Sequence, residues 1–454
     1  MRCRLDACAR DVRLWDSGRV CANNPAMRAL LGLALLATLT LSGSRLARAQ
    51  TPQAPHAPET LTDTAGASPD DAHRAPGADD AGHAAATESA AAAAATPSPF
   101  SLGGYVEAFY QWNFRDPSNG ITNARGFDNR HNTFTLANVA LEAAWDYEGL
   151  VGRVALQVGH TPSTYYLAEP RAAGTDATSA TGPEVWKYVQ QAQAGYRFDV
   201  ARGLTVSAGV FLSPIGPESI PIRDSWNWSR SNLFFGLPFY HAGARAALAL
   251  TDAWTVTLAV YNGWNSVVDG NDDKSISAQL AYARDDFSMS ILYFGGVERP
   301  RDAPEGRAFR HLLDAYATWH ATRRLSLLAH VDGGLEPNAL GLSAWIAGAL
   351  AVRFRLAEAW SIAVRGDAFH ERVADGAKGR ATPIFFPAPW VASATATLDY
   401  RPHERVSIRL EYRHDQAGSD LYFGGDVRGD GVTVPFATNR DAQDTVTLGA
   451  TSWF

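Results

Sequence analysis

Cysteine is scarce in this chain of 454 residues, and the three that exist lie near its start, at Cys3, Cys8 and Cys21. We expect all three to be removed during export, for the reasons given in the next paragraph. The remaining chain then has no disulfide framework, no thiol nucleophile and no cysteine metal site. The residues around the expected cleavage site contain no cysteine, which argues against an acyl anchor.

Long hydrophobic runs are also missing. The longest, Ala29 to Leu41, is too short for a comfortable membrane helix. It follows Met27 and Arg28 and precedes Ala47-Arg48-Ala49, so residues 27–49 are predicted to be a secretory signal peptide with an A-x-A cleavage site. Residues 1–26 are then a misassigned start. A buried core helix is the alternative for the apolar run.

The chain has fewer basic than acidic residues, and its sequence contains none of the common catalytic motifs. Residues 1–49 carry eight arginines and three aspartates, so the rest of the chain has a net charge of −12, against −7 for the whole. Such an acidic protein is a poor nucleic-acid binder. H-E-x-x-H, G-x-S-x-G and phosphate-binding glycine motifs are absent from the sequence, so we predict no cofactor, no metal and no enzyme.

Residues 50–99 hold almost no large apolar side chains. They are mostly Ala, Pro, Asp, Thr and His, with an alanine run from Ala90 to Ala95. This segment cannot bury a core and is predicted to be a disordered periplasmic segment. A short helix at the alanine run and a tether to cell wall or partner remain open. Fifty such residues are too few and too polar for the folded plug of a TonB-dependent receptor.

From Phe100 onward, alternating apolar and polar residues indicate strands separated by turn residues. We predict sixteen strands, a count uncertain by two, at about 102–113, 132–145, 150–160, 186–198, 203–212, 239–250, 253–262, 274–283, 286–297, 310–321, 324–335, 342–354, 359–370, 389–400, 405–415 and 443–454. Their connections alternate between tight turns and mostly long loops, of which 114–131, 161–185, 213–238, 371–388 and 416–442 are the largest. This asymmetry predicts an all-β, transmembrane, up-and-down antiparallel barrel with short periplasmic turns and long extracellular loops.

The two faces of these strands differ in charge. In the segment from Val406 to Arg413, Val406, Ile408, Leu410 and Tyr412 alternate with Arg409, Glu411 and Arg413. So many charges on the polar face do not fit a dry core, and a wide, wet lumen accommodates them. The last strand alternates to a terminal aromatic, Phe454, as outer-membrane barrels commonly end. We therefore predict that Phe454 is read by the barrel-assembly machinery and that lipid of the Gram-negative outer membrane surrounds the barrel.

Six short motifs occur in an order and spacing known from one family. They are Gly104-Tyr-Val-Glu-Ala-Phe-Tyr110, Ser213-Pro-Ile-Gly216, Asn227-Trp-Ser-Arg-Ser231, Phe235-Gly-Leu-Pro-Phe-Tyr-His241-Ala-Gly243, Tyr261-Asn-Gly-Trp-Asn265 and Glu411-Tyr-Arg-His-Asp415. Through them, residues 100–454 resemble the OmpL-like family of β-barrel porins. The resemblance implies an outer-membrane barrel that passes small solutes, and it says little about which ones. Segment 50–99 is not part of the pattern.

The loop from Ser213 to Pro238 is the best candidate for a pore constriction, by analogy with general porins. Three prolines stiffen it. Its charged and aromatic residues predict a transverse field with an apolar contact for a passing sugar or aromatic solute: Glu218, Arg223, Asp224, Trp226, Trp228 and Arg230. The alternative is a loop that only caps the rim or packs on a neighbour.

Eleven charged residues are predicted to line the lumen, seven basic and four acidic: Glu107, Glu142, Arg153, Lys187, Arg197, Arg245, Arg365, Asp367, Arg409, Glu411 and Arg413. The excess of basic residues suggests a mild anion preference, and cross-strand structural ladders are the alternative. Asp269-Gly-Asn-Asp-Asp273 has oxygen ligands at calcium-like spacing but lacks the distal Glu of an EF-hand, so solvated loop acids are favoured.

The sequence thus predicts an exported outer-membrane porin for passive diffusion of small hydrophilic solutes or ions. Two other functions stay open: a non-conducting barrel that serves as surface adhesin or scaffold, and an outer-membrane hydrolase with a Ser/His pair on its outer face. A homotrimer is a further open prediction, since sixteen-stranded porins often trimerise, but no residue demands it.

Overall fold

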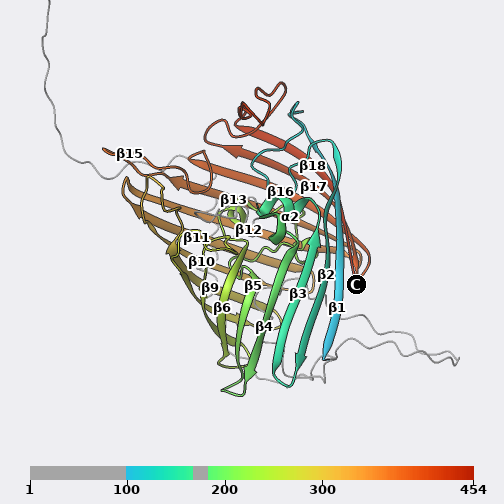
Figure 1. The fold of residues 1–454 in the computed structure, drawn as a ribbon. Helices are drawn as coiled ribbons and strands as arrows, with labels where there is room; N and C mark the ends of the chain where they lie inside the picture. The colour runs from blue at the N-terminus through green and yellow to red at the C-terminus, as the bar shows by residue number, and fades with distance from the viewer. Residues whose placement is uncertain (1–98, 167–182) are drawn as a thin grey trace, which may run out of the picture. The chain divides into compact units, whose positions relative to one another are not determined.

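A computed structural model describes residues 99–166 and 183–454 of the chain. In it, sixteen strands close into one antiparallel barrel (Figure 1). Their bounds are β1 (Phe100–Asn113), β2 (Thr133–Tyr147), β3 (Leu150–Val158), β4 (Val189–Phe198), β5 (Leu204–Leu212), β6 (Tyr240–Ala249), β7 (Trp254–Tyr261), β8 (Ser275–Ala283), β9 (Phe287–Val297), β10 (Phe309–Trp319), β11 (Leu325–Asn338), β12 (Gly341–Ala357), β13 (Trp360–Arg372), β16 (Trp390–His403), β17 (Val406–Ala417) and β18 (Ala442–Trp453). The predicted fold class and strand number are confirmed.

The smaller elements lie in the connections. They are α2 (His160–Tyr165), α3 (Pro183–Trp186), η2 (Ile222–Asp224), α4 (Asn232–Phe235) and the hairpin of β14 (Asp375–Gly376) with β15 (Gly379–Arg380). Within the described ranges, the helices are all too short or too polar to cross a membrane. The predicted segments 1–26, 27–49 and nearly all of 50–99 lie outside the described residues, so the signal peptide and the periplasmic segment stay predictions.

Each barrel strand pairs with the next one along the chain, and β1 pairs with β18 to close the ring. The closing register runs from Tyr105 opposite Trp453 to Asn113 opposite Thr445. Beyond β18, the Phe454 amide still donates to the Gly104 carbonyl at 3.1 Å. Closure leaves no unpaired strand edge, which is the condition for a sheet to stand in lipid.

The alternation in sequence becomes an alternation of environment. In β17, Ile408, Leu410 and Tyr412 are exposed on the outside, whereas Arg409 and Glu411 are buried inside the barrel. β3 shows the same alternation, whereas β1 and β7 also turn the aromatic Tyr105, Phe109 and Tyr261 inward. The predicted inward charges are therefore present, but part of the interior is a buried apolar cluster around Phe294 and Phe369.

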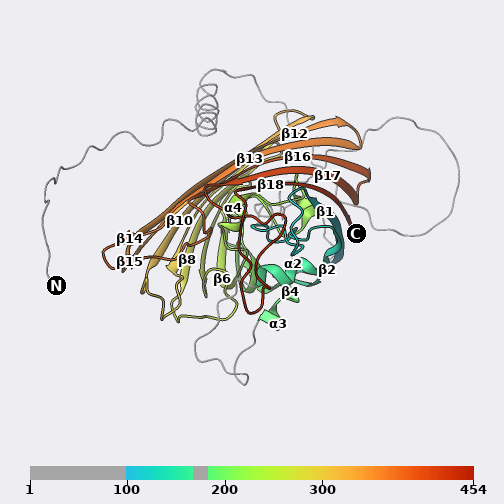
Figure 2. The ribbon, with the colours of Figure 1, turned by 90° about the horizontal axis from the view of Figure 1, so that it is seen from above.

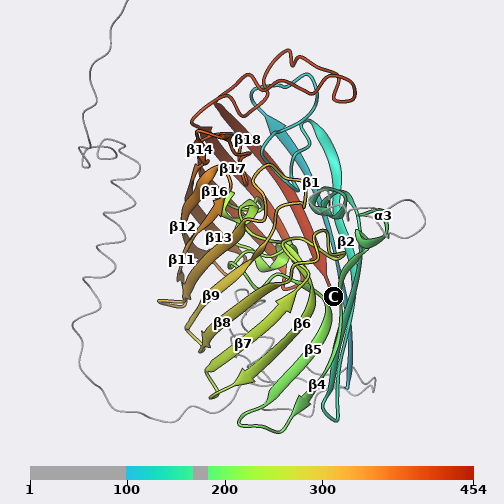
Figure 3. The same cartoon turned by 60° about the vertical axis from the view of Figure 1, so that its left-hand side comes forward.

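The two rims differ as expected (Figure 3). The turn between β2 and β3 consists of Glu148 and Gly149, both at positive φ (49° and 86°), which suits a two-residue hairpin turn. The opposite rim carries the segments 114–132, 159–166, 183–188, 213–239, 373–389 and 418–441. One expected loop is nearly absent, because β11 and β12 extend until only Ala339 and Leu340 join them.

Candidate functional site: a loop inside the barrel lumen

The connection between β5 and β6, residues 213–239, folds into the barrel and crosses the lumen. We call it the lumen loop. Its helix α4 lies inside the ring of strands (Figure 2), against β12, β13 and β16. Its other helix, η2, contacts β18. The loop thus starts on one wall and is held on the opposite one.

Carboxylates on the wall receive the backbone N–H groups of the lumen loop. Glu411 accepts from Trp228 N at 2.6 Å and from Ser229 N at 3.0 Å. Three more wall carboxylates each accept from one backbone N–H: Glu107 from Ile222 (2.5 Å), Asp314 from Gly216 (3.1 Å) and Asp367 from Asn232 (3.0 Å). An irregular loop away from bulk water must satisfy its amides, and charged acceptors make the stronger bonds.

Arginines on the wall donate to the carbonyls of the same loop. Arg409 Nη1 donates to the Ile222 and Asn227 carbonyls at 3.0 and 3.2 Å. Arg413 Nη1 reaches the Arg230 carbonyl at 2.5 Å, and Arg365 Nη1 reaches the Ser229 carbonyl at 2.7 Å. Donors and acceptors of both charges on the wall therefore fix the loop backbone.

Two tryptophans of the loop pack differently. Trp228 is fully buried against Phe109, with ring centroids 6.0 Å apart, and fills the space above Gly449 so closely that a Cβ there would lie 2.1 Å from its ring. Trp226 packs near Ala351 and Ala363 and also lines a hollow of the lumen. The expected joint contact surface for a solute is therefore wrong for Trp228 and stays a prediction for Trp226 alone.

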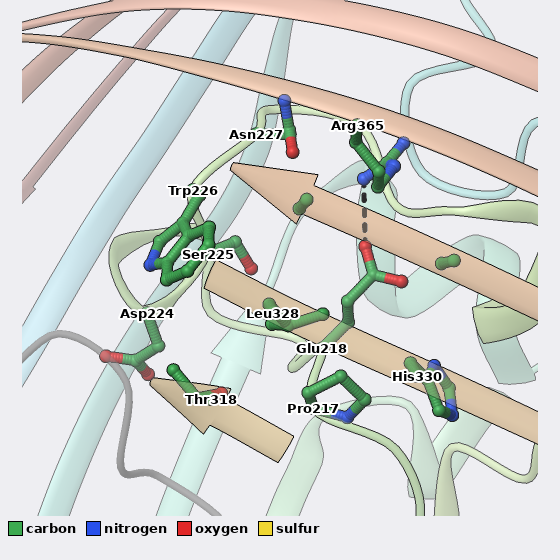
Figure 4. A pocket seen from close by; sticks show the side chains of 12 residues that line it. Pro217, Glu218, Asp224, Ser225, Trp226, Asn227, Thr318, Leu328, His330 and Arg365 are labelled. Atoms are coloured by element: carbon green, nitrogen blue, oxygen red, sulfur yellow. Dashed lines mark hydrogen bonds and ion pairs between the residues drawn. The ribbon is translucent and has the colours of Figure 1, made fainter. Parts of the chain in front are cut away.

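Two hollows flank the lumen loop and share Pro217, Glu218 and Asp224 on their walls. One, of about 40 Å³, is also lined by Trp226, His330 and Arg365 (Figure 4). The other, of about 80 Å³, is also lined by basic side chains. Those basic side chains are Arg153, Arg223 and Arg245.

Charge pairs order the groups around these hollows. Glu142 lies 2.9 Å from Arg223 and 3.4 Å from Arg153, and Glu218 lies 3.0 Å from Arg365. Burial of the Asp224 side chain raises the pKa of its carboxyl above the usual value. The neighbouring charge of Arg223 acts in the opposite direction and lowers this pKa in part. Arg230 instead packs over the Phe127 ring at 5.1 Å and donates to the Ser219 and Trp228 carbonyls. It is a structural residue of the loop and does not line either hollow.

Ten of the eleven predicted lumen residues lie on barrel strands with their side chains toward the interior: Glu107, Glu142, Arg153, Arg197, Arg245, Arg365, Asp367, Arg409, Glu411 and Arg413. Lys187 differs. It precedes β4 in a turn, because α3 ends at Trp186, and its ammonium lies 5.2 Å from the ring centroid of the exposed Tyr188. The strand predicted to begin at 186 begins at Val189.

The two readings of these charges, lumen lining and cross-strand ladder, apply to different residues. Arg153 with Glu142 joins the neighbouring strands β3 and β2, as a ladder would, and Arg197 of β4 reaches Asp146 of β2 across β3. Glu107, Arg365, Asp367, Arg409, Glu411 and Arg413 instead hold the lumen loop. Sequence reasoning did not foresee this role, because it requires knowing what lies opposite each strand.

Several interior acids were missed. Asp314, Asp332, Glu336, Asp399 and Asp415 are buried on β10, β11, β16 and β17. Their inward position in the alternation was the available signal. With these five acids and the further interior arginines Arg310 and Arg353, the barrel interior has no excess of basic residues, so the predicted set gives no support for an anion preference.

The acidic segment 269–273 forms ordinary loop contacts. Asp269 Oδ1 accepts from the Asn271 and Asp272 amides at 2.9 and 2.8 Å. Asp269, Asp272 and Asp273 each pair with a basic side chain, namely Lys274, Arg301 and Arg307. These pairs account for the carboxylates, in line with solvated loop acids.

Residues 99–454 match the model of the family described as "Putative beta-barrel porin-2, OmpL-like". The chain belongs to this porin family. It is accordingly an outer-membrane porin, a passive diffusion channel, as the motif resemblance implied. No curated protein matches the chain.

Solved porin structures share the fold at low sequence identity. An anion-selective porin from Comamonas acidovorans aligns with a TM-score of 0.50 and 10% identity, covering 78% of this chain and 99% of that one. A trimer form of OmpT, an outer membrane protein from Vibrio cholerae, aligns with a TM-score of 0.50 and 9% identity over 78% and 99% of the two chains. At this identity the likeness concerns the barrel fold alone.

Proposed function

We propose that this porin passes small hydrophilic solutes through a lumen that its loop 213–239 constricts. The observation that carries the proposal is the anchoring of the loop across the lumen by carboxylates and arginines of β1, β10, β13 and β17. Such bonds hold the loop in one place while solutes pass beside it. The constriction residues facing the hollows are Glu218, Arg223, Asp224 and Trp226.

The charges beside the larger hollow suggest how solutes are selected. Arg153, Arg223 and Arg245 line this hollow together with Glu218 and Asp224, so charges of both signs border one small space. Opposite charges across a narrow passage create a transverse field, which orients dipolar solutes and disfavours apolar ones. We therefore favour zwitterionic or strongly dipolar solutes over neutral apolar ones.

The test is single-channel conductance in planar bilayers of the protein purified from outer membranes, beside a variant lacking residues 216–235. We expect discrete steps from the intact protein and larger steps from the deletion variant. Heat-modifiable gel mobility verifies that both are folded. Folded barrels that stay silent in both forms would refute the porin constriction.

One observation favours a second candidate, a barrel closed at rest. The lumen loop is bonded to β1, β10, β13 and β17, so it lies in the passage itself. In that case the intact protein stays silent and only the deletion variant conducts, and the long loops would then serve as an adhesin or scaffold surface. We propose no catalytic role, and a serine-reactive activity probe that labels the folded protein would contradict this.

The remaining proposals concern assembly. We propose export by the signal peptide 27–49, insertion by the barrel-assembly machinery and residence in outer-membrane lipid. The apolar outer face of β17 supports the lipid contact. A homotrimer is proposed for the native state, and the native mass in detergent decides it.

A further inference from the structure

Three side chains with metal-binding atoms meet on the lumen wall at the root of the lumen loop. Asp314 lies on β10, and His330 and Asp332 lie on β11. Asp314 and Asp332 are direct cross-strand partners, and His330 shares the face of Asp332 two residues away. One ligand atom from each of the three lies within 4.8 Å of the others. Sequence reasoning predicted no metal site, because residues on two strands form no local motif.

The three side chains are buried yet incompletely bonded. His330 Nε2 pairs with Asp314 Oδ2 at 2.6 Å, Asp314 Oδ1 accepts from Gly216 N, and Asp332 Oδ1 accepts from Trp345 Nε1 at 2.9 Å. His330 Nδ1 and Asp332 Oδ2 are buried without a hydrogen-bond partner within the described residues. Such atoms are costly, and carboxylates directly opposite one another repel. A bound cation would remove both costs.

We propose that Asp314, His330 and Asp332 bind one divalent transition-metal cation of the Zn²⁺ class. One imidazole nitrogen with carboxylate oxygens is a donor set that Zn²⁺ accepts, whereas Mg²⁺ and Ca²⁺ favour all-oxygen sets. His330 also lines the hollow beside Pro217 and Glu218, so this ligand borders the space next to the lumen loop (Figure 4).

The position of the site links cation binding to the channel. Asp314 holds the amide of Gly216, which begins the inward course of the lumen loop, and Gly216 also lies close to the His330 ring. A cation on these residues ties the loop root more firmly to β10 and β11. It also cancels negative charge beside the hollow, so bound Zn²⁺ should shift the reversal potential toward anions.

The test is binding of Co²⁺ and Zn²⁺ to the chelator-treated protein purified from outer membranes. Calorimetry is expected to give one equivalent of Zn²⁺, and the visible absorption of Co²⁺ reports its coordination. Binding should weaken by about 100-fold in His330→Ala, which removes a ligand, and also in Asp332→Asn, which removes the negative charge of another ligand. His414→Gln is the matched control, because His414 pairs with Asp444 at 2.8 Å in a partly exposed His–Asp pair away from the lumen.

Equal Zn²⁺ uptake by wild type and folded His330→Ala would overturn the proposal, as would displacement of Zn²⁺ by equimolar Ca²⁺. If the variants do not fold, X-ray absorption of the Zn²⁺-loaded wild type decides. One imidazole nitrogen with carboxylate oxygens at about 2.0–2.2 Å supports the site, and a shell of oxygen atoms only refutes it. The conductance of the intact porin is measured separately, so loss of metal binding and loss of porin function are distinguishable.

Discussion

At the scale of single residues, the charged side chains of the barrel interior act mainly as anchors. Glu411 alone accepts three hydrogen bonds, two from loop amides and one from Thr397 Oγ1 at 2.7 Å. Inside a low-dielectric wall such bonds are strong, and an unmatched partner is costly. The charged interior side chains therefore position the lumen loop.

Replacing Glu411 with Gln should loosen the lumen loop. The amide keeps one acceptor oxygen but turns an N–H₂ donor toward a loop N–H, so one charge-assisted bond is lost, at a cost of about 1–3 kcal/mol. We expect a noisier and larger single-channel conductance. Glu404→Gln is the control, because Glu404 lies in a short turn and pairs with its chain neighbour Arg405 at 3.5 Å. Identical traces from both variants would show that Glu411 does not hold the loop.

Acidification should move the ion preference toward anions through Asp224. Because burial raises the pKa of Asp224, its carboxyl takes up a proton at a higher pH than an ordinary aspartate. Protonation removes a negative charge beside Arg223, whose Nε lies 3.7 Å away. Reversal potentials are measured in a salt gradient as the pH is lowered from 7. Their shift should begin at a higher pH in wild type than in Asp224→Asn. The same titration in both proteins would exclude Asp224 as the responsive group.

At the scale of elements, the strands are inverted amphipathic units. Along β17 the outward residues from Val406 to Tyr412 are aliphatic or aromatic. The inward residues at alternate positions from Arg409 to Asp415 are all charged. The lumen loop depends on that inward row, since Arg409, Glu411 and Arg413 all bond to it. One strand thus presents an apolar row on the outer face of the barrel and the anchors of the candidate site on the inner face.

Placing a charge on the lipid face should destabilise the barrel. Leu410 is half exposed on the outer face of β17, and an arginine near the bilayer midplane costs about 2–4 kcal/mol. Leu410→Arg should therefore lower the denaturant midpoint in lipid vesicles. Val432→Arg, in the loop 418–441 where Val432 is already 90% exposed, is the matched control. Equal midpoints would mean that this face of β17 does not meet lipid.

At the scale of the whole molecule, closure between β1 and β18 decides whether the chain is a membrane protein. The two ends of the barrel sequence meet there, from Tyr105 opposite Trp453 onward. Phe454 extends the pairing by its bond to Gly104, and a Cβ on Gly104 would lie 3.0 Å from the Phe454 ring. Phe454 therefore follows β18 directly and packs on β1.

Removing Phe454 should slow assembly of the barrel. The deletion loses the bond to Gly104 and the terminal aromatic that we propose the assembly machinery reads. The fraction of heat-modifiable protein in outer-membrane fractions should fall several-fold. Phe114→Ala, which removes an exposed phenylalanine from the loop 114–132, is the control. Normal yield after deletion would show that Phe454 is dispensable for assembly.

The sequence predicted the strands well because their signal is local. An alternation of period two, bounded by turn residues, marks each strand and its faces, and the bounds differ by only a few residues from those observed. Two places are exceptions. The helix α3 ends at Trp186, so Lys187 lies in a turn before β4, and β11 and β12 are longer than predicted, with only two residues between them. Short helices and the β14–β15 hairpin carried no periodic signal.

The sequence by itself determined the barrel and which charged side chains face its interior. The reason is that apolar and polar residues alternate with a period of two along each strand. Only the tertiary structure decided that residues 213–239 cross the lumen and that Glu107, Asp314, Asp367 and Glu411 hold them. It also decided that Asp314, His330 and Asp332 meet. Those contacts join residues far apart in the chain, and they exist because barrel closure brings opposite walls within reach of one loop.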